Sequence, residues 1–206
     1  MVHGGKLKDL SSLNKRAEEF IDEFKQAQVH LAVLTWQQHN GDVWQPPSST
    51  KYKFNFNAAI FLGLDRFGNG AVIRNDKGEV MATMIASGPK VNMSDKAKLL
   101  ACRRAIEFAV DVGFSRLIIE GHNSKVIQAI SSPLENSSLF GNVVNDIRHL
   151  VWELQWSRVC CFTRGANKVA HVLAQYARST LDEDLYWMED SPPPALKALY
   201  HDSLSI

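Results

Sequence analysis

The stretch KYKFNFNAA at residues 51–59 alternates large apolar side chains with polar ones. A period of two is typical of a β-strand, and the pattern predicts a strand from about residue 52 to 61. The polar row of this strand ends on Asn55 and Asn57. An amide carries no charge, cannot act as a general base and is a poor sole ligand for a hard metal ion. Asn57 is therefore either a packing residue or the replacement of a functional one.

The composition predicts one sizeable folded domain with extensions. Of the 206 residues, 45% are hydrophobic, which excludes an entirely disordered chain. Lys and Arg number 23 against 22 Asp and Glu, and the net charge is +1. A site for a polyanion would therefore have to be a local patch.

The cysteines and apolar runs indicate an intracellular protein, cytoplasmic or nuclear, without a membrane partner. Cys102, Cys160 and Cys161 show no metal-ligand spacing, and adjacent cysteines rarely pair, so reduced thiols are expected. Residues 1–15 lack the apolar core of a signal peptide. No apolar run is long enough to span a bilayer.

Segments at both ends extend the predicted domain. Apolar residues at spacings of three and four predict an amphipathic helical arm in residues 1–43, which end in a linker. Trp44 is expected to anchor this linker on the domain. Residues 181–206 combine acidic, aromatic and proline residues, and we expect an ordered wrap or a partner-binding tail.

For the domain itself, residues 44–180, the sequence predicts the order strand-strand-strand-helix-strand-helix-helix-strand-helix. Residues 75–78 give a hairpin turn signal, so the first three strands should be antiparallel. The last two strands alternate with helices and should be parallel. Ser94 and Asn167 are candidate N-caps of the helices that they begin. Three glycines predict a loop between the first two strands: Gly63, Gly68 and Gly70.

Five motifs follow one another along the chain: WQPP from residue 44, KYKFNFNAA, GNGAVIRNDKGEV, AKLLACRRAIEFAVDVGFSRLIIEGHNSKVIQAI and RGANKVAHVLAQYA. Together they resemble the ribonuclease H-like domains of plant genomes, many of which derive from the C-terminal part of retrotransposon polyproteins. The resemblance covers residues 44–206 and implies an α/β ribonuclease H-like fold. Its five-stranded mixed sheet would have three antiparallel and two parallel strands, flanked by helices.

The resemblance also implies hydrolysis of the RNA strand of RNA/DNA hybrids by two Mg²⁺ ions held between four acidic residues. Mg²⁺ prefers oxygen ligands, and a metal pair needs several negative charges around it. The four matching positions here hold Asn57, Lys98, His122 and His171. Losing four acids and gaining a lysine shifts the local charge by roughly five units. We therefore expect no metal ion, no other cofactor and no two-metal catalysis.

Nearby acids are not expected to restore the cluster. Asp95 lies one helical turn before Lys98, and Asp65 lies in a loop. Successive side chains of a strand point to opposite faces, so Glu120 points away from the face of the residue that follows it. A weaker alternative is that one such carboxylate, together with the amide and the two imidazoles, binds zinc or manganese.

Each of the four positions also has a simpler interpretation. Asn57 can be a hydrogen-bonded polar residue on a half-buried strand, and Lys98 a solvated lysine. His122 and His171 lie at helix N-termini, which favour neutral imidazoles. If they converge in one pocket, Lys98 and the histidines could instead contact phosphate, or cleave RNA by metal-free acid-base catalysis.

The sequence favours a catalytically inactive ribonuclease H-like protein, domesticated or decaying from a plant retroelement, that binds RNA/DNA hybrid or double-stranded RNA. The best candidates for phosphate contacts are Lys98, Arg164, Asn167 and Lys168. Four further basic residues belong either to the same phosphate-contacting surface or to an ordinary charged surface: Lys51, Lys53, Arg103 and Arg104. Two alternatives are an active ribonuclease and a protein-interaction module that uses the N-terminal helix or the C-terminal tail.

Overall fold

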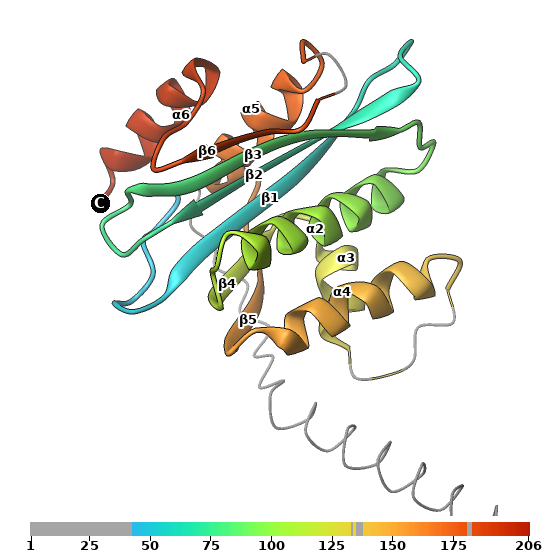
Figure 1. Ribbon diagram of the computed structural model, residues 1–206, viewed down its shortest axis with the longest axis horizontal. Helices are drawn as coiled ribbons and strands as arrows, with labels where there is room; N and C mark the ends of the chain where they lie inside the picture. The colour runs from blue at the N-terminus through green and yellow to red at the C-terminus, as the bar shows by residue number, and fades with distance from the viewer. Residues whose placement is uncertain (1–42, 133, 135–137, 181–182) are drawn as a thin grey trace, which may run out of the picture. The chain divides into compact units, whose positions relative to one another are not determined.

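The computed structural model describes residues 43–132, 134, 138–180 and 183–206. One six-stranded sheet forms its centre, in the order β5-β4-β1-β2-β3-β6 (Figure 1). The strands are β1 (Tyr52–Ile60), β2 (Arg66–Arg74), β3 (Val80–Pro89), β4 (Arg116–Gly121), β5 (Trp156–Cys161) and β6 (Leu185–Met188). The helices are α2 (Ser94–Asp111), α3 (Ser124–Ser131), α4 (Gly141–Glu153), α5 (Lys168–Tyr176), α6 (Pro193–Ser203) and the short 3-10 helix η1 (Gly165–Asn167). The predicted N-terminal arm lies outside the described residues, apart from Val43.

The sheet is mixed, as the sequence predicts. β1, β2 and β3 form an antiparallel meander, whereas β1, β4 and β5 run parallel to one another. Short connections allow only antiparallel pairing, while an intervening helix returns the chain to the end from which a parallel strand starts. In this register Asn55 of β1 lies opposite Glu120 of β4.

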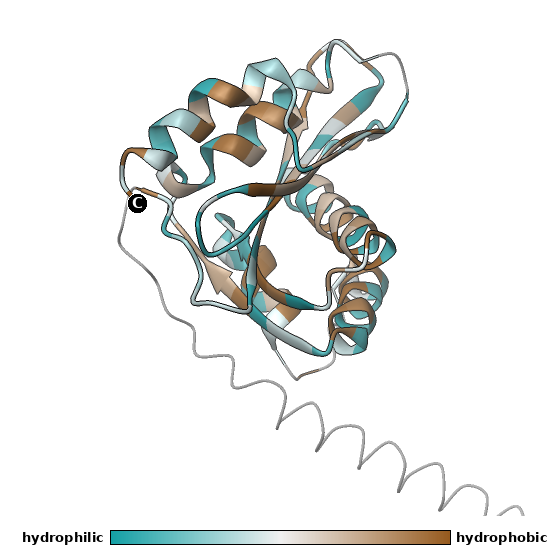
Figure 2. Ribbon diagram, turned by 60° about the vertical axis from the view of Figure 1, so that its left-hand side comes forward, coloured by the Kyte–Doolittle hydropathy of each residue, from teal (hydrophilic) through white to brown (hydrophobic). Residues whose placement is uncertain are grey.

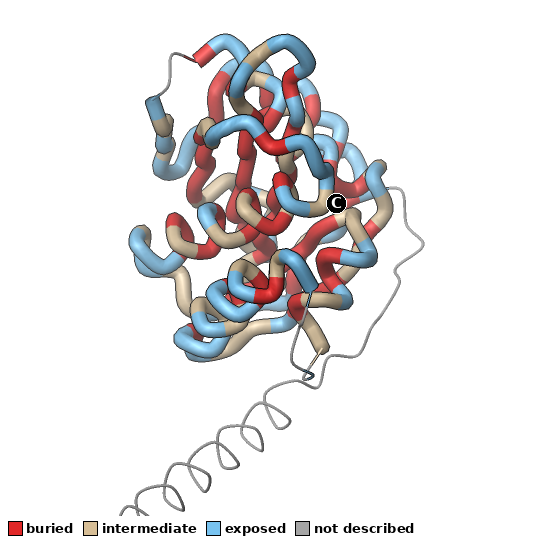
Figure 3. The backbone as a smooth tube through the Cα atoms, turned by 90° about the vertical axis from the view of Figure 1, so that its right-hand side faces the viewer, coloured by how far each residue is buried: buried red, intermediate tan, exposed pale blue. Residues whose placement is uncertain are grey.

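Helices cover both faces of the sheet, and alternate residues of each strand point to opposite faces. Phe54 and Phe56 of β1 pack in one cluster with residues of α2, α3 and α4. Val72 of β2 and Ile85 of β3 pack in another with α5 and α6 (Figure 1). Figure 2 shows hydrophobic and hydrophilic residues alternating along these helices, and Figure 3 shows the buried residues concentrated between the layers. No helix in the described part of the chain has both the length and the apolar composition to cross a membrane.

Gly68 and Gly70 lie inside β2, so their prediction as loop residues is wrong. A Cβ atom at Gly70 would collide with the backbone nitrogen of Ala174 in α5. It would also lie 2.6 Å from Leu173 Cβ and 2.7 Å from the carbonyl oxygen of Ala170. Glycine here allows α5 to pack directly on the strand backbone, which is the other common role of glycine in a strand.

The prediction of five strands is also wrong, because residues 185–188 add a sixth. They pair antiparallel with β3, with Ala82 opposite Met188 and Ile85 opposite Leu185. A strand of four residues is too short to give a clear periodic signal. After it, α6 packs against α5.

Of the two predicted N-caps, Asn167 is at the observed position and Ser94 is not. α2 begins at Ser94 itself, so Met93 holds the N-cap position and no side chain caps the helix. Asn167 holds the N-cap position of α5, but its side chain does not cap that helix. Asn123 does cap α3, because its Oδ1 accepts a hydrogen bond from the Val126 N–H at 3.1 Å.

Candidate functional site

Asn57 lies on β1 and contacts α5. Its Oδ1 accepts a hydrogen bond from the Ala58 N–H at 2.9 Å, and its Nδ2 lies 3.1 Å from Nδ1 of His171. An amide nitrogen only donates, so His171 Nδ1 must be the acceptor and the ring proton of the neutral imidazole sits on Nε2. Asn57 is 3% exposed. It is a hydrogen-bonded polar residue that orients His171.

His122 follows β4 directly and is oriented by Asn167. The Nδ2 of Asn167 donates to the Phe56 carbonyl oxygen at 3.0 Å and lies 3.3 Å from Nδ1 of His122. By the same reasoning, His122 carries its ring proton on Nε2. Asn167 is 2% exposed, and its Oδ1 is buried without a hydrogen-bond partner among the described residues. Asn167 therefore joins the start of α5 to β1 and to His122.

Lys98 brings a cation to the same place from α2. Together with Phe56 and His122 it lines a cavity of about 10 Å³, at the limit of what one water molecule needs. One turn earlier on α2, Asp95 Oδ1 accepts a hydrogen bond from Asn123 Nδ2 at 2.8 Å. That carboxylate is therefore engaged with the start of α3.

Both imidazoles are held in the neutral form. Burial, followed by the charges of Lys98 and Arg164 and by His171, lowers the pKa of His122 to about 4. Burial and Arg164 also lower the pKa of His171. Lys168 is exposed and lies three residues before His171, so the two are neighbours on the α5 surface. The structure thus gathers the positions predicted from the sequence: Asn57, Lys98, His122, His171, Arg164, Asn167 and Lys168.

These residues do not fit the two magnesium ions that the resemblance implies. The four matching positions supply an amide, a lysine and two imidazoles, whereas Mg²⁺ selects oxygen ligands and carboxylates above all. The amide oxygen of Asn57 already accepts a hydrogen bond, and Lys98 adds a positive charge. Within the described residues, no group of three or more His, Cys, Asp or Glu side chains is placed to hold a metal ion.

The low pKa of His122 predicts a loss of stability in mild acid. Above its ordinary pKa of 6.5 the ring is neutral in both states, and as the pH falls toward 4 the unfolded chain takes up the proton first. The full shift corresponds to about 3 kcal/mol, which solvent screening of this half-buried ring reduces to about 1–2 kcal/mol. Urea unfolding between these pH values should show the loss in wild type and a flatter profile in His122→Gln. An unchanged profile in the variant would contradict this assignment.

Asn55 is the centre of a network of buried polar groups that the sequence motifs do not indicate. Asn55 Oδ1 accepts hydrogen bonds from Trp44 Nε1 at 3.0 Å and from Arg74 Nη2 at 3.2 Å. Asn55 Nδ2 donates to Glu120 Oε2 at 2.9 Å. Trp44 is completely buried here, so the expected packing of this residue on the domain is confirmed, while the linker before residue 43 lies outside the described residues.

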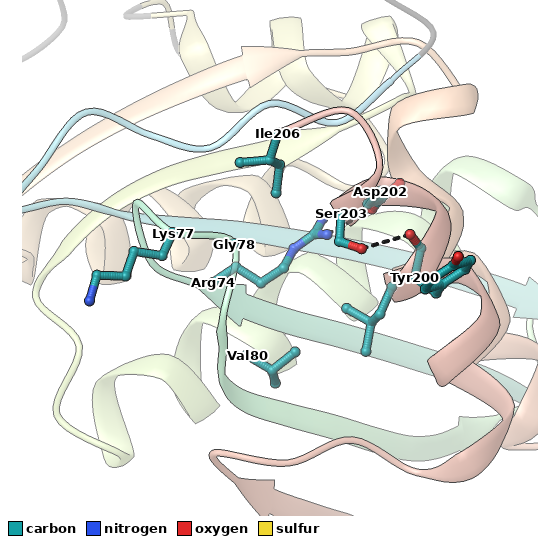
Figure 4. A pocket seen from close by; sticks show the side chains of 9 residues that line it. Arg74, Lys77, Gly78, Val80, Tyr200, Asp202, Ser203 and Ile206 are labelled. Atoms are coloured by element: carbon teal, nitrogen blue, oxygen red, sulfur yellow. Dashed lines mark hydrogen bonds and ion pairs between the residues drawn. The ribbon is translucent and has the colours of Figure 1, made fainter.

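Two buried ion pairs extend this network. Lys53 Nζ lies 2.7 Å from Glu120 Oε1, and Arg74 Nη1 lies 2.7 Å from Asp202 Oδ2 on α6 (Figure 4). Burial raises the pKa of Glu120, and the neighbouring Lys53 opposes that shift. Lys53 is 6% exposed, so its placement on a charged surface is wrong. The parallel register that sets Asn55 opposite Glu120 was the signal that could have revealed the network.

Comparison with known proteins connects this arrangement to a family. Residues 55–177, more than half of the chain, match the family described as reverse transcriptase-like. No curated protein matches the chain.

Solved structures share the fold at low sequence identity. RNase H1 from the halophilic archaeon Halobacterium salinarum is 18% identical with a TM-score of 0.56, over 63% of this chain and 98% of that one. The N-terminal RNase H domain of a Mycobacterium tuberculosis protein is 16% identical with a TM-score of 0.56, over 64% and 95%. LC11-RNase H1, solved in complex with an RNA/DNA hybrid, is 16% identical with a TM-score of 0.54, over 61% and 94%. The chain has the ribonuclease H-like fold and belongs to the reverse transcriptase-like family.

Proposed function

We propose that this protein is a catalytically inactive ribonuclease H-like protein that binds nucleic acid, either RNA/DNA hybrid or double-stranded RNA. The observation that carries the proposal is a cluster of cations around the four replaced acidic positions: Lys98, Arg164 and Lys168. None of the three forms an ion pair with a carboxylate of the described residues. Phosphate oxygens would supply the missing negative charge.

Other basic residues are already engaged, which narrows the proposed binding surface. Arg103 pairs with Asp146 at 3.0 Å, and Arg104 pairs with Asp184 at 2.5 Å. The Lys51 ammonium lies 4.3 Å from the centre of the Trp156 ring. Of the basic residues that the sequence indicates, those left without a described partner are Lys98, Arg164 and Lys168, beside His122 and His171.

The two histidines are suited to bind phosphate as neutral donors. Each ring accepts a hydrogen bond at Nδ1 and keeps its proton on Nε2, where it can donate to an anion. Asn167 is buried, and we assign it the role of positioning His122 rather than touching phosphate. Metal-free cleavage would require a protonated imidazole as general acid, and a pKa of about 4 at His122 argues against one near neutral pH.

Family membership and the hybrid-bound relative of the same fold favour nucleic acid as the partner. The motifs that resemble plant retrotransposon-derived domains support an origin in such an element. For an active ribonuclease the site would need carboxylates that the four positions lack, so we propose binding without hydrolysis.

The experiment is a mobility-shift titration of labelled RNA/DNA hybrid, double-stranded RNA and single-stranded RNA at two salt concentrations. We expect a shift with the duplexes that weakens as salt rises, because binding releases counterions from the phosphates and this release is less favourable at higher salt concentration. The triple variant Lys98→Ala, Arg164→Ala, Lys168→Ala should bind roughly tenfold or more weakly and show a shallower salt dependence. Arg116→Ala is the matched control, because Arg116 is an exposed cation at the opposite end of β4 from His122.

The same reactions, run with excess protein and Mg²⁺, Mn²⁺ or EDTA, test the absence of catalysis. We expect intact strands with wild type and Mg²⁺-dependent cleavage only after the fourfold reversion Asn57→Asp, Lys98→Glu, His122→Asp, His171→Asp. Cleavage of the hybrid by wild type would overturn the inactive assignment. No shift at low salt would overturn the binding assignment independently.

A further inference from the structure

Hydrogen bonds to the backbone of β1 fix the orientation of two side-chain amides in the site. Asn57 Oδ1 accepts from the Ala58 N–H at 2.9 Å, so Nδ2 is the atom that lies 3.1 Å from Nδ1 of His171. Asn167 Nδ2 donates to the Phe56 carbonyl oxygen at 3.0 Å, and turning this amide over would set two acceptor oxygens against each other. Neither amide can therefore exchange its oxygen and nitrogen positions without losing a backbone hydrogen bond.

Each fixed amide determines which nitrogen of a histidine carries the proton. The Nδ2 atoms of Asn57 and Asn167 lie 3.1 and 3.3 Å from Nδ1 of His171 and His122 respectively. An amide nitrogen can only donate, so each Nδ1 supplies its lone pair and the ring proton stays on Nε2. A protonated ring is disfavoured as well, because its Nδ1–H would point at another donor. Both histidines are thus held as the Nε2–H tautomer by the protein itself.

A histidine in this state has no lone pair for a metal ion. A neutral imidazole coordinates a metal through one nitrogen, and metal-binding histidines typically donate their other N–H to a carboxylate or a carbonyl oxygen. His122 and His171 show the opposite arrangement, because an amide donor occupies Nδ1 and a proton occupies Nε2. Binding zinc or manganese would require a change of tautomer and the loss of the hydrogen bond to each amide.

The charges around the two rings also favour an anion. After burial, the charges of Lys98 and Arg164 and the neighbouring His171 help to lower the pKa of His122, so these groups lie near its ring. Arg164 follows burial among the causes that lower the pKa of His171. No carboxylate of the described residues contributes to either shift, and the acid nearby on α2, Asp95, is hydrogen-bonded to the start of α3.

We propose that Asn57 and Asn167 make this site selective for an anion over a metal ion. By fixing both tautomers they withhold the imidazole lone pairs from metals, and they present the Nε2–H groups of His122 and His171 to the oxygen atoms of a phosphate group. The inference rests on the proposed function and deepens it. It assigns the choice of ligand to two neutral amides as well as to the loss of the acids.

The first test is long-range ¹H–¹⁵N correlation NMR of the ¹⁵N-labelled wild-type chain at neutral pH. The chain has seven histidines, and the variants His122→Gln and His171→Gln assign the two signals of interest. We expect both rings to show a protonated Nε2 and an unprotonated Nδ1. In separate titrations, inorganic phosphate should shift both signals saturably, with a dissociation constant of about 1 mM or below, and Zn²⁺ at the same concentration should leave them unchanged.

The variant Asn57→Asp should reverse the preference. A carboxylate only accepts, so Nδ1 of His171 must then carry the proton and the Nε2 lone pair becomes free. We expect an Nδ1–H signal, Zn²⁺ binding at least about tenfold tighter than in wild type, and phosphate binding about tenfold weaker. Asn142→Asp is the matched control, because it adds the same charge at an exposed position in the first turn of α4.

Three results would overturn the proposal: an Nδ1–H tautomer of either ring in wild type, Zn²⁺ binding to the wild-type rings as tightly as in Asn57→Asp, or no response of either ring to phosphate. The wild-type spectra decide the first and the third even if Asn57→Asp does not fold, which circular dichroism melting would reveal. None of these measurements uses nucleic acid. Duplexes that fail to bind a protein with the expected tautomers would therefore overturn the proposed function alone.

Discussion

Replacement of Gly70 by alanine is expected to destabilise the protein strongly. The added Cβ would collide with the backbone of α5 at Ala174 and crowd Leu173 Cβ at 2.6 Å. Backbone atoms cannot rotate away as a side chain can, so α5 would have to lift from the sheet. We expect a loss of about 3 kcal/mol or more, a large part of the typical total of about 5–15 kcal/mol. Urea unfolding followed by circular dichroism measures it.

Gly88→Ala provides the matched control for that experiment. The new Cβ at Gly88 would meet only ring atoms of Phe67, a side chain that can shift. We expect a smaller loss, about 1 kcal/mol. Equal losses in the two variants would show that contact with the α5 backbone is not what requires glycine at residue 70.

Replacement of Arg74 by methionine is expected to destabilise the protein by about 3–5 kcal/mol, because it leaves the buried carboxylate of Asp202 without its cation. Arg74 also donates to Asn55 at 3.2 Å, and its guanidinium carbon lies 3.6 Å from the centre of the Trp44 ring. The variant therefore weakens contacts of α6, β1 and Trp44 at once. The measurement is the free energy of unfolding in urea at neutral pH.

Two controls isolate the buried charge as the cause. The double variant Arg74→Met, Asp202→Leu removes both charges and should recover most of the lost stability. Lys90→Ala breaks an ion pair with Asp65 whose side chains are 60% and 92% exposed, and should cost less than about 1 kcal/mol. A double variant no more stable than Arg74→Met would contradict the explanation.

The parts of the fold that the sequence predicts are those encoded by local periodicity. Alternation along residues 51–59 and the turn at 75–78 predict the meander, and helical spacing after residue 94 predicts α2. What the sequence did not predict depends on contacts between distant segments. Gly70 looks like a loop residue until α5 is known to lie on it, and residues 185–188 become a strand only by pairing with β3.

In the candidate site too, local sequence motifs predict the residues, and contacts between distant segments are not predicted. Motif resemblance located Asn57, Lys98, His122 and His171, and the structure brings them together. The motifs could not show that Asn57 orients His171 or that Asn167 contacts His122, because those hydrogen bonds join β1, β4 and α5. The network around Asn55 could not be predicted from the sequence for a related reason. Strand alternation tells which face a residue is on, but not which charges the neighbouring strand places beside it.

The added strand β6 also changes how the sheet ends. Without it, the ten-residue β3 would present a long row of unpaired backbone N–H and C=O groups to solvent. Such rows pair with strands of other molecules and lead to aggregation. β6 covers residues 82–85 of β3 and leaves an outermost strand of only four residues. The segment beyond the family match thus protects the protein against intermolecular strand pairing.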